Sequence, residues 1–281
     1  MRKSCDDCIK IGEKYFKFGK YEQAIEAFKI ATEIKPDSAK AHYNLGLTCF
    51  KEKENTRDLS GASKHFNEAI NINPKYADAY SYMGIIHFKL ENYKEATSLL
   101  KKAVKFDSKV IRAYLKLVSI YFDKNKFKKS INVLNKAIKV FDNIDIKEKE
   151  DGRLYFYLGK AHLKLNNYNE AKKAFDKALK LIKPEFPYLA DLYFGLGISN
   201  ERQKNNSAAL KYYQKAIEEE PNNPRGYVKV GTLNEQMKNY QKSIKNYIKA
   251  LKNGANKTYI HYKLGVVYSK NNEEIKIERK K

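Results

Sequence analysis

Apolar residues along the chain recur at helical spacing in short segments that come in pairs. The segment after residue 77 places apolar or small side chains on one helix face: Ala79, Tyr80, Met83, Gly84, Ile86 and His87. The segment after residue 92 repeats this spacing: Ala96, Leu99, Leu100, Ala103 and Val104. Glu91-Asn92 interrupts the pattern between them. It therefore predicts two amphipathic helices joined by a tight turn.

The same pair recurs along the chain with a basic step of thirty-four residues. One position of the repeat holds a glycine in seven of the eight copies and Val118 in the fourth copy. The glycines are Gly12, Gly46, Gly84, Gly159, Gly197, Gly231 and Gly265. An alanine follows this place nineteen residues later in six copies: Ala31, Ala103, Ala137, Ala178, Ala216 and Ala250. Repetition at this period predicts an array of helix pairs.

The register of the repeat sets the expected boundaries. The copies begin near Cys5, Ala39, Ala77, Ile111, Gly152, Ala190, Pro224 and Thr258. Insertions interrupt the step around 53–56, 143–151 and 184–189, where turns are expected. We expect a lead at 1–4, a single solenoid over 5–270 whose last helix covers 258–270, and a charged tail at 271–281.

Small residues hold the places where helices must approach closely. We expect Gly84 and Ala96 to let the helices of one pair touch, and Ala103 to let the next pair stack. Prolines end several second helices, because proline cannot continue a helix: Pro36, Pro74 and Pro221.

These residues resemble the tetratricopeptide repeat family. The seventh copy shows the family pattern of aromatic, glycine and alanine places: Tyr227, Val230, Gly231, Tyr240, Ser243, Tyr247 and Ala250. The departures are few, with Val118 in place of glycine and Ser130 and Ser243 in place of alanine. The resemblance covers about residues 5–270 and implies an all-α, right-handed superhelix of about seven helix pairs plus a C-terminal helix. It also implies that the first helices line a concave, ligand-binding groove.

The expected groove residues share one stripe of the first helices. Four phenylalanines form a column beside lysines in the amino-terminal half: Phe16, Phe50, Phe88 and Phe122. The predicted peptide-binding residues are Tyr43, Leu47, Phe50, Lys51, Ile85, Phe88, Lys89 and Phe122. An apolar strip rimmed by positive charge suits a peptide with apolar anchors and acidic flanks. The alternative is that the family pattern supplies these residues for packing. In the carboxy-terminal half, Glu201 and Glu235 replace the aromatics.

The net charge leaves two kinds of partner open. The chain has 56 lysines and arginines against 33 acidic residues, a formal charge of +23. An acidic protein or a nucleic acid would suit such a surface. Lysine dominates, however, whereas phosphate recognition favours the planar fork of arginine. RNA binding or ribonucleoprotein assembly therefore stays as the alternative to a protein-interaction scaffold.

Candidate chemistry is sparse. Cys5 and Cys8 form a C-x-x-C pair, and only His42 and Cys49 offer further ligands for a metal. Four of the five histidines fill packing places of the repeat, and the glycines are too widely spaced to form a phosphate-binding loop. We expect a non-enzymatic protein without cofactor or metal.

The expected location of the protein in the cell rests on two kinds of segment, a membrane-spanning run and a secretory signal. No apolar run is long enough to span a membrane, and the first residues lack a secretory signal. We therefore expect an intracellular protein, with the cytoplasm favoured over the nucleus.

The C-terminal end breaks the pattern. We expect Asn271 and Asn272 to end the last helix, and Ile260, Leu264 and Val267 to offer an apolar face to a missing neighbour. Three interpretations stay open: the charged tail is a solvating cap, the C-terminal end is an assembly surface, or the chain is a piece of a longer protein.

Overall fold

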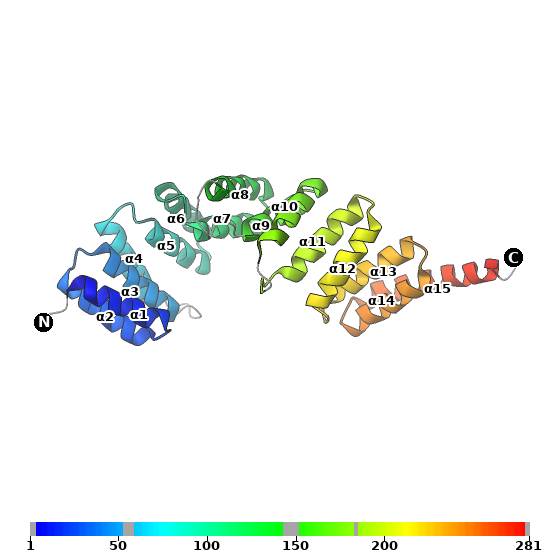
Figure 1. Cartoon of the computed structure of the whole chain (residues 1–281), viewed down its shortest axis with the longest axis horizontal. Coiled ribbons are helices and arrows are strands. Elements are labelled where there is room, and N and C mark those ends of the chain that lie inside the picture. The colour runs from blue at the N-terminus through cyan, green and yellow to red at the C-terminus, as the bar shows by residue number, and fades with distance from the viewer. Residues whose placement is uncertain (1–3, 53–58, 143–151, 183–184, 279–281) are drawn as a thin grey trace. The chain divides into compact units, whose positions relative to one another are not determined.

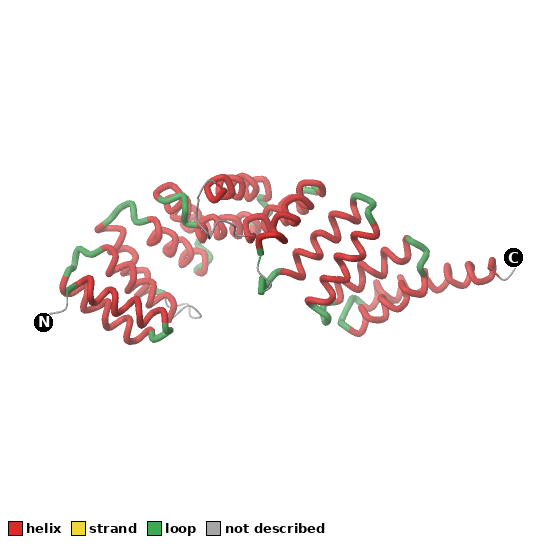
Figure 2. The backbone as a smooth tube through the Cα atoms, viewed as in Figure 1, coloured by secondary structure: helices red, strands yellow, loops and turns green. Residues whose placement is uncertain are grey.

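The computed structural model describes residues 4–52, 59–142, 152–182 and 185–278, with side chains described as far as residue 272. These residues form helices joined by turns and contain no strand, so the all-α prediction is confirmed (Figure 2). The first eight helices, labelled in Figure 1, are α1 Cys5–Lys17, α2 Tyr21–Ile34, α3 Ala39–Glu52, α4 Ser60–Ile72, α5 Ala77–Lys89, α6 Tyr93–Phe106, α7 Ile111–Asp123 and α8 Phe127–Asp142. The other seven are α9 Gly152–Lys164, α10 Tyr168–Leu181, α11 Leu189–Arg202, α12 Asn206–Glu219, α13 Pro224–Gln236, α14 Tyr240–Lys252 and α15 Lys257–Glu278.

The chain divides into two compact units, Met1–Asp145 and Ile146–Lys281. In the first unit the odd-numbered helix of each pair packs on the even-numbered one that follows, from α1 with α2 to α7 with α8. The second unit pairs α9 with α10, α11 with α12 and α13 with α14, and α15 packs on α14. The single solenoid over 5–270 stays a prediction. The expected insertions at 53–56 and 143–151 lie outside the described residues.

The predicted register matches the helix starts. Six first helices begin at the predicted residue, from α1 at Cys5 to α13 at Pro224, while α11 and α15 begin one residue earlier than predicted. In six of the pairs, the turn between the two helices uses one residue with a positive φ, at the same place of the repeat. These residues are Gly19, Glu91, Asn125, Asn166, Lys204 and Lys238.

The repeated glycine is the point of closest approach within a pair. A methyl group built on Gly84 would lie 2.6 Å from Leu100 Cγ, and one on Gly231 would lie 2.8 Å from Tyr247 Cδ1. Real side chains do not show such short contacts, so a larger residue at Gly84 or Gly231 would force the neighbouring side chain or helix to shift. Gly265 is different, because a methyl group there would meet nothing within 4 Å.

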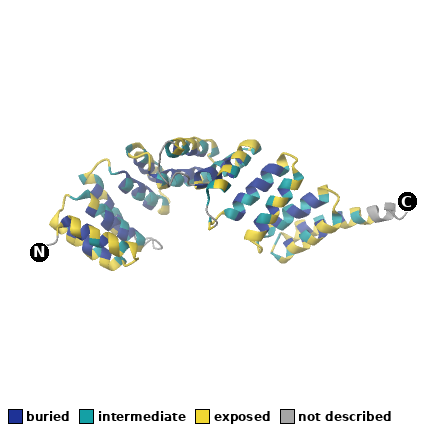
Figure 3. Ribbon diagram, in the orientation of Figure 1, coloured by how far each residue is buried: buried dark blue, intermediate teal, exposed yellow. Residues whose placement is uncertain are grey.

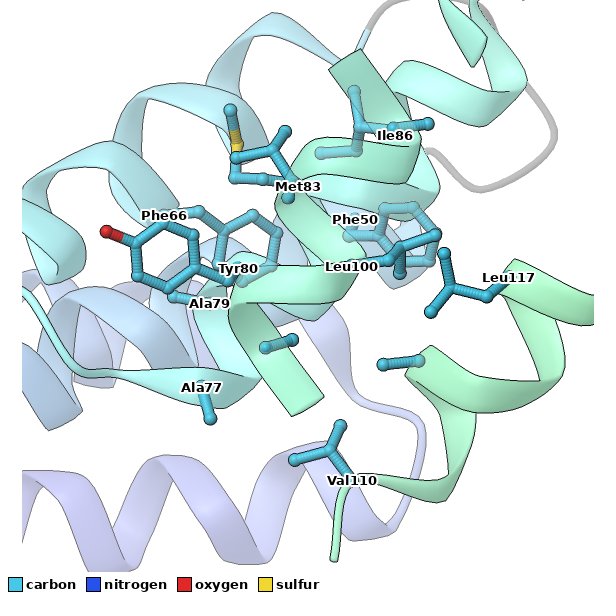
Figure 4. Close-up of a cluster of buried hydrophobic side chains, with 14 of the residues drawn as sticks. Phe50, Phe66, Ala77, Ala79, Tyr80, Met83, Ile86, Leu100, Val110 and Leu117 are labelled. Atoms are coloured by element: carbon cyan, nitrogen blue, oxygen red, sulfur yellow. The ribbon is translucent and has the colours of Figure 1, made fainter. Parts of the chain in front are cut away.

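The core of each unit lies between the helices of successive pairs, where the buried residues gather (Figure 3). Ala96 and Ala103, expected at helix contacts, are completely buried. Figure 4 shows part of the first unit's core, where Met83, Ile86 and Leu100 from one pair lie near Leu117 from the next.

The predicted C-terminal end is wrong in two respects. Helix α15 does not stop at residue 270 but continues to Glu278. Asn271 is tolerated inside the helix because Gln241 Nε2 donates a hydrogen bond to its Oδ1 at 3.3 Å, and such contacts override weak helix propensity. In addition, Ile260 and Val267 are fully buried against α14 instead of facing a missing neighbour.

Candidate protein-binding face of the first unit

The predicted groove residues lie on helices α3, α5 and α7, and the structure places them at different depths. Tyr43, Leu47, Ile85, Phe88, Lys51 and Phe122 are half-buried, and Lys89 is exposed. These side chains are at least partly accessible to solvent, whereas Phe50 is not. We call the surface formed by Tyr43, Leu47, Tyr82, Ile85, Phe88, Lys89 and Lys116 the lysine–aromatic face.

Phe50 does not belong to this face, and the prediction that its ring is exposed is wrong. Its side chain is only 2% exposed and lies in the same cluster as Met83 and Leu100 (Figure 4). The ring of Tyr82 packs edge-on against it, with the centroids 5.4 Å apart. Phe50 therefore supports the packing of α3 on α5. This agrees with the alternative interpretation, in which the family pattern supplies this residue for packing.

Tyr82 is the centre of an aromatic network that joins three elements. Its ring stacks on Phe66 at 5.4 Å with an interplanar angle of 9°. The Arg112 guanidinium also lies over the Tyr82 ring, 5.0 Å from the ring centroid, and forms an ion pair with Asp78. The cation of α7 is thereby held between an aromatic ring and a carboxylate of α5, a geometry that suits the planar guanidinium.

Burial governs the tyrosines beside this network. Tyr43 packs on Tyr76 with the ring centroids 5.1 Å apart. Burial, with a smaller contribution from Asp78, raises the pKa of Tyr43 above its ordinary value and that of Tyr76 to about 12. Both tyrosines are therefore neutral at physiological pH.

Lys116 places a positive charge among apolar side chains. Its Nζ lies 4.2 Å from the centroid of the Phe88 ring, and the side chain is half-buried. Burial, followed by repulsion from Lys89, lowers the pKa of Lys116 and outweighs the opposite effect of Asp123. Because the charged form is destabilised by both effects, a carboxylate brought to this position would relieve them.

Arg112, Tyr82 and Lys116 are not among the residues predicted from the sequence. The last two occupy the sixth place of their units, a column of the first helices that faces the preceding pair. The available signal was this column, which holds an aromatic residue or lysine in most copies: Lys10, Tyr82, Lys116, Tyr157, Lys229 and Lys263.

In the second unit, charged side chains on the first helices form ion pairs and hydrogen bonds with one another. Lys229 Nζ lies 3.0 Å from Glu201 Oε2, and the Tyr213 hydroxyl donates to the same carboxylate. Glu235 accepts in the same way from Lys263 at 2.9 Å. Glu201 and Glu235 therefore join successive first helices, and each carboxylate is paired with a lysine of the next first helix.

Glu235 also binds Lys270 at 3.0 Å and the Tyr247 hydroxyl at 3.1 Å. Burial by itself would raise the pKa of Glu235, but the hydrogen bonds from Lys263, Lys270 and Tyr247 outweigh it and the pKa falls below its ordinary value. The carboxylate is thus ionised at neutral pH.

The candidate metal residues do not assemble. Cys5 and Cys8 are buried free thiols that pack in the core of the first pair. His42 stacks on His65 with the ring centroids 5.9 Å apart. Among the residues whose positions are described, no three histidine, cysteine or acidic side chains gather so that they could hold a metal ion. In the same part of the chain, no helix combines the length and apolarity that crossing a bilayer requires.

Family models match the chain in several places. Models described as TPR repeat or tetratricopeptide repeat match residues 12–52 and 58–91, 77–106, 115–190 and 158–224, and 224–253. The chain belongs to the tetratricopeptide repeat family. Proteins of this family in general are non-enzymatic scaffolds that mediate protein–protein interactions.

Curated relatives match over a limited stretch. The mitochondrial import receptor subunit TOM70 of Rattus norvegicus is 33% identical over 88 residues, which cover 30% of this chain and 14% of the receptor. The human RNA polymerase II-associated protein 3 is 32% identical over 85 residues, which cover 30% of this chain and 12% of that protein. The match thus spans a small part of each relative's length.

Solved structures share the fold over a larger part of the chain. PilF of Pseudomonas aeruginosa matches with a TM-score of 0.64 at 19% identity, covering 77% of this chain and 92% of PilF. The C-terminal part of a TPR repeat-containing protein from Cytophaga hutchinsonii matches with a TM-score of 0.62 at 22% identity, covering 90% of this chain and 98% of the other. These likenesses establish a helical-repeat solenoid fold.

Proposed function

We propose that the chain is an interaction scaffold whose lysine–aromatic face binds a protein segment carrying carboxylates beside apolar side chains. The observation that carries this proposal is the half-buried Lys116 ammonium, 4.2 Å from the Phe88 ring and destabilised by burial and by Lys89. A carboxylate between the two lysines would form charge-assisted hydrogen bonds in a partly desolvated place, where such bonds are stronger than in water.

The neighbouring side chains define the apolar part of the partner. Leu47, Ile85 and Tyr82 are half-buried and lie on helices α3 and α5. They would pack against aliphatic or aromatic side chains of a segment lying across these helices. The proposed partner is therefore a peptide with apolar anchors and at least one acidic residue placed to reach Lys116.

A protein partner is favoured over RNA on this face by the arrangement of its cations. Arg112, which lies on the Tyr82 ring, already pairs with Asp78. Part of its fork is therefore occupied within the chain, and a phosphate would have to compete with the Asp78 carboxylate for bidentate binding.

Selection of peptides from a displayed random library tests the proposal. We expect peptides that bind the purified chain to be enriched in acidic residues next to apolar ones. Reversing Lys89→Glu together with Lys116→Glu should weaken their binding at least tenfold, because two attractive contacts become repulsive. The matched control is Lys94→Glu with Lys101→Glu, which reverses two exposed lysines of α6 and should leave binding unchanged.

Salt and RNA distinguish the alternative. Binding through apolar anchors should weaken only modestly between 0.1 and 0.5 M salt, whereas phosphate binding weakens steeply. Peptides that bind the reversed variant as tightly as the original chain would contradict the proposal. So would a single-stranded RNA homopolymer that binds the original chain with a steep salt dependence and no longer binds the reversed variant.

A further inference from the structure

The positive charge of the first unit is concentrated on two of its second helices. Helices α6 and α8 together carry eight lysines and two acidic residues, whereas α2 and α4 carry two lysines and four acidic residues. A lysine-rich composition by itself would spread the charge over all four helices, so it does not account for this difference. Both basic helices pack on the same first helix, α7, and therefore lie close to each other (Figure 1).

Helical spacing gathers these lysines on the solvent side. On α6, Lys94, Lys101 and Lys105 follow one another at intervals of seven and four residues, which places them on one stripe of the helix. This stripe lies opposite Ala96 and Ala103, which are completely buried. The lysines of α8 likewise lie opposite the buried residues of that helix. We call the exposed lysines of the two helices the basic surface: Lys94, Lys101, Lys102, Lys105, Lys128, Lys129, Lys136 and Lys139.

Several cations of the basic surface are available to an external anion. Within the described part of the chain, Lys101, Lys105 and Lys136 form no ion pair with a carboxylate. Lys229 and Lys263 of the second unit differ, because each is paired with a glutamate. Neighbouring lysines repel one another, so an anion with negative charges repeated along its length would stabilise the basic surface.

The side chains between the lysines indicate the chemistry of this anion. Ser98, Asn132 and Asn135 are exposed and carry hydroxyl or amide groups that both donate and accept hydrogen bonds. Among the described residues, none of the large hydrophobic side chains that are exposed lies on α6 or α8. The basic surface therefore lacks an aromatic platform for unstacked bases, and it lacks the apolar anchors that protein interfaces and membrane-bound helices use.

We propose that the basic surface binds the backbone of double-stranded RNA without reading its sequence. Lysine binds a phosphate as a point charge, and contacts to phosphates carry no sequence information. Duplex RNA also presents 2′-hydroxyl groups across its wide minor groove. These groups donate and accept hydrogen bonds, as the side chains between the lysines do. This activity is separate from the peptide binding proposed for the lysine–aromatic face.

An RNA duplex of mixed sequence and about twenty base pairs is the direct probe, since double-stranded RNA-binding domains span about sixteen. We expect it to bind the full chain in a fluorescence anisotropy titration, with an affinity that falls steeply as salt rises. Each phosphate that a lysine neutralises contributes about −0.9 to the slope of log K against log salt for a DNA duplex, and we expect a similar value here.

Charge reversal tests whether the position of the lysines matters. Lys101→Glu with Lys136→Glu should weaken binding of the RNA duplex about tenfold or more at low salt. The matched control is Lys29→Glu with Lys64→Glu, which changes the net charge equally at exposed lysines of α2 and α4. The control should weaken binding less than about threefold, because distant charges are screened.

A milder change gives a second measurement in case the reversed variant loses its helicity in circular dichroism. Lys101→Gln with Lys136→Gln should reduce the steepness of the salt slope by about two, because two phosphate contacts are lost. An unchanged slope in this neutral variant would contradict the proposal.

Other anions distinguish the source of the negative charge. The RNA duplex should bind more tightly than a DNA duplex of the same sequence, than a single-stranded RNA of equal length, and than vesicles with about 30% phosphatidylserine. Lys89→Glu with Lys116→Glu, which alters the lysine–aromatic face, should bind the RNA duplex within about threefold of the original chain. Failure of the peptide-binding proposal and failure of this one can therefore be told apart.

Three results would overturn the proposal. The first is an equal loss of affinity in the α6–α8 variant and its control, since net charge alone would then explain binding. The second is a DNA duplex or single-stranded RNA that binds as tightly as the RNA duplex. The third is binding of the original chain to the vesicles without binding to the RNA duplex.

Discussion

Replacing Gly197 and Gly265 by alanine in turn isolates the free energy of close packing at the repeated glycine. Both glycines hold the same place of the repeat and lie on first helices of the second unit. A methyl group on Gly197 would overlap the Tyr213 ring, with Cδ1 at 2.5 Å, whereas one on Gly265 meets nothing within 4 Å. The ring cannot easily move away, because Tyr213 is fully buried and its hydroxyl is bonded to Glu201.

The magnitude follows from two opposing effects. Alanine is favoured over glycine inside a helix by about 1 kcal/mol at either position. Overpacking at Gly197 costs about 1–3 kcal/mol, and no such cost applies at Gly265. We therefore expect Gly265→Ala to raise the free energy of unfolding by up to about 1 kcal/mol. Gly197→Ala should change it by between about 0 and −2 kcal/mol, so that the two variants differ by about 1–3 kcal/mol.

Urea unfolding followed by circular dichroism measures this difference. With a slope of about 2 kcal/mol per molar urea, it corresponds to midpoints separated by about 0.5–1.5 M. Since repeat arrays can unfold in steps, amide hydrogen exchange in α11 and α12 should report the local loss in Gly197→Ala directly. Equal midpoints together with unchanged exchange would refute the assignment of this glycine as the contact between paired helices.

Two further predictions concern the core and the ionic bonds. Phe50→Ala should lower the free energy of unfolding by about 3–5 kcal/mol, because the ring is buried. Phe88→Ala, at a half-buried position, should lower it by about 1–2 kcal/mol. Thermal melts of the two variants measure the difference. Glu235→Gln should cost about 1–2 kcal/mol at pH 7, where the carboxylate binds Lys263 and Lys270. Because the pKa of Glu235 is depressed when folded, its contribution is complete above 4.5, its ordinary pKa, and is lost as the pH falls through the folded pKa. The free energies of unfolding of the original chain and of Glu235→Gln should therefore converge in acid. A difference between them that stays constant in urea titrations from pH 7 to pH 3 would contradict this.

The helix pairs could be predicted because one periodic signal fixes them. The glycine at Gly84 and its equivalents sets the contact inside a pair, and from that register the starts of α5 and α13 follow to the residue. The end of α15 could not be predicted in this way. Asn271 and Asn272 weaken a helix by intrinsic propensity, and only tertiary contacts such as the one from Gln241 decide the outcome.

The candidate site was predictable in part. The first-helix stripe predicted Ile85 and Phe88 as groove residues; both are half-buried, and their role in binding stays a prediction. Helical spacing does not reveal how deeply a neighbouring pair covers each side chain. Phe50 is therefore buried by α5 although it holds the same place as Phe88. Lys116 was missed because its importance comes from the ring of a different helix, which no single-helix pattern contains.

The bonds from Glu201 to Lys229 and from Glu235 to Lys263 tie successive first helices of the second unit together, and the ion pairs Lys40–Glu13 and Arg112–Asp78 do the same in the first unit. Stability of a repeat array depends on such couplings between neighbours. Ionic couplings with partly exposed lysines are weakened by salt, while stacked rings are not. Rising ionic strength should therefore weaken the exposed Lys40–Glu13 pair, at 59% and 45% side-chain exposure, before it weakens the Lys263–Glu235 pair, at 20% and 9%. The ionic contacts between neighbouring repeats should then be lost in the order of their exposure to solvent and not in the order of the sequence.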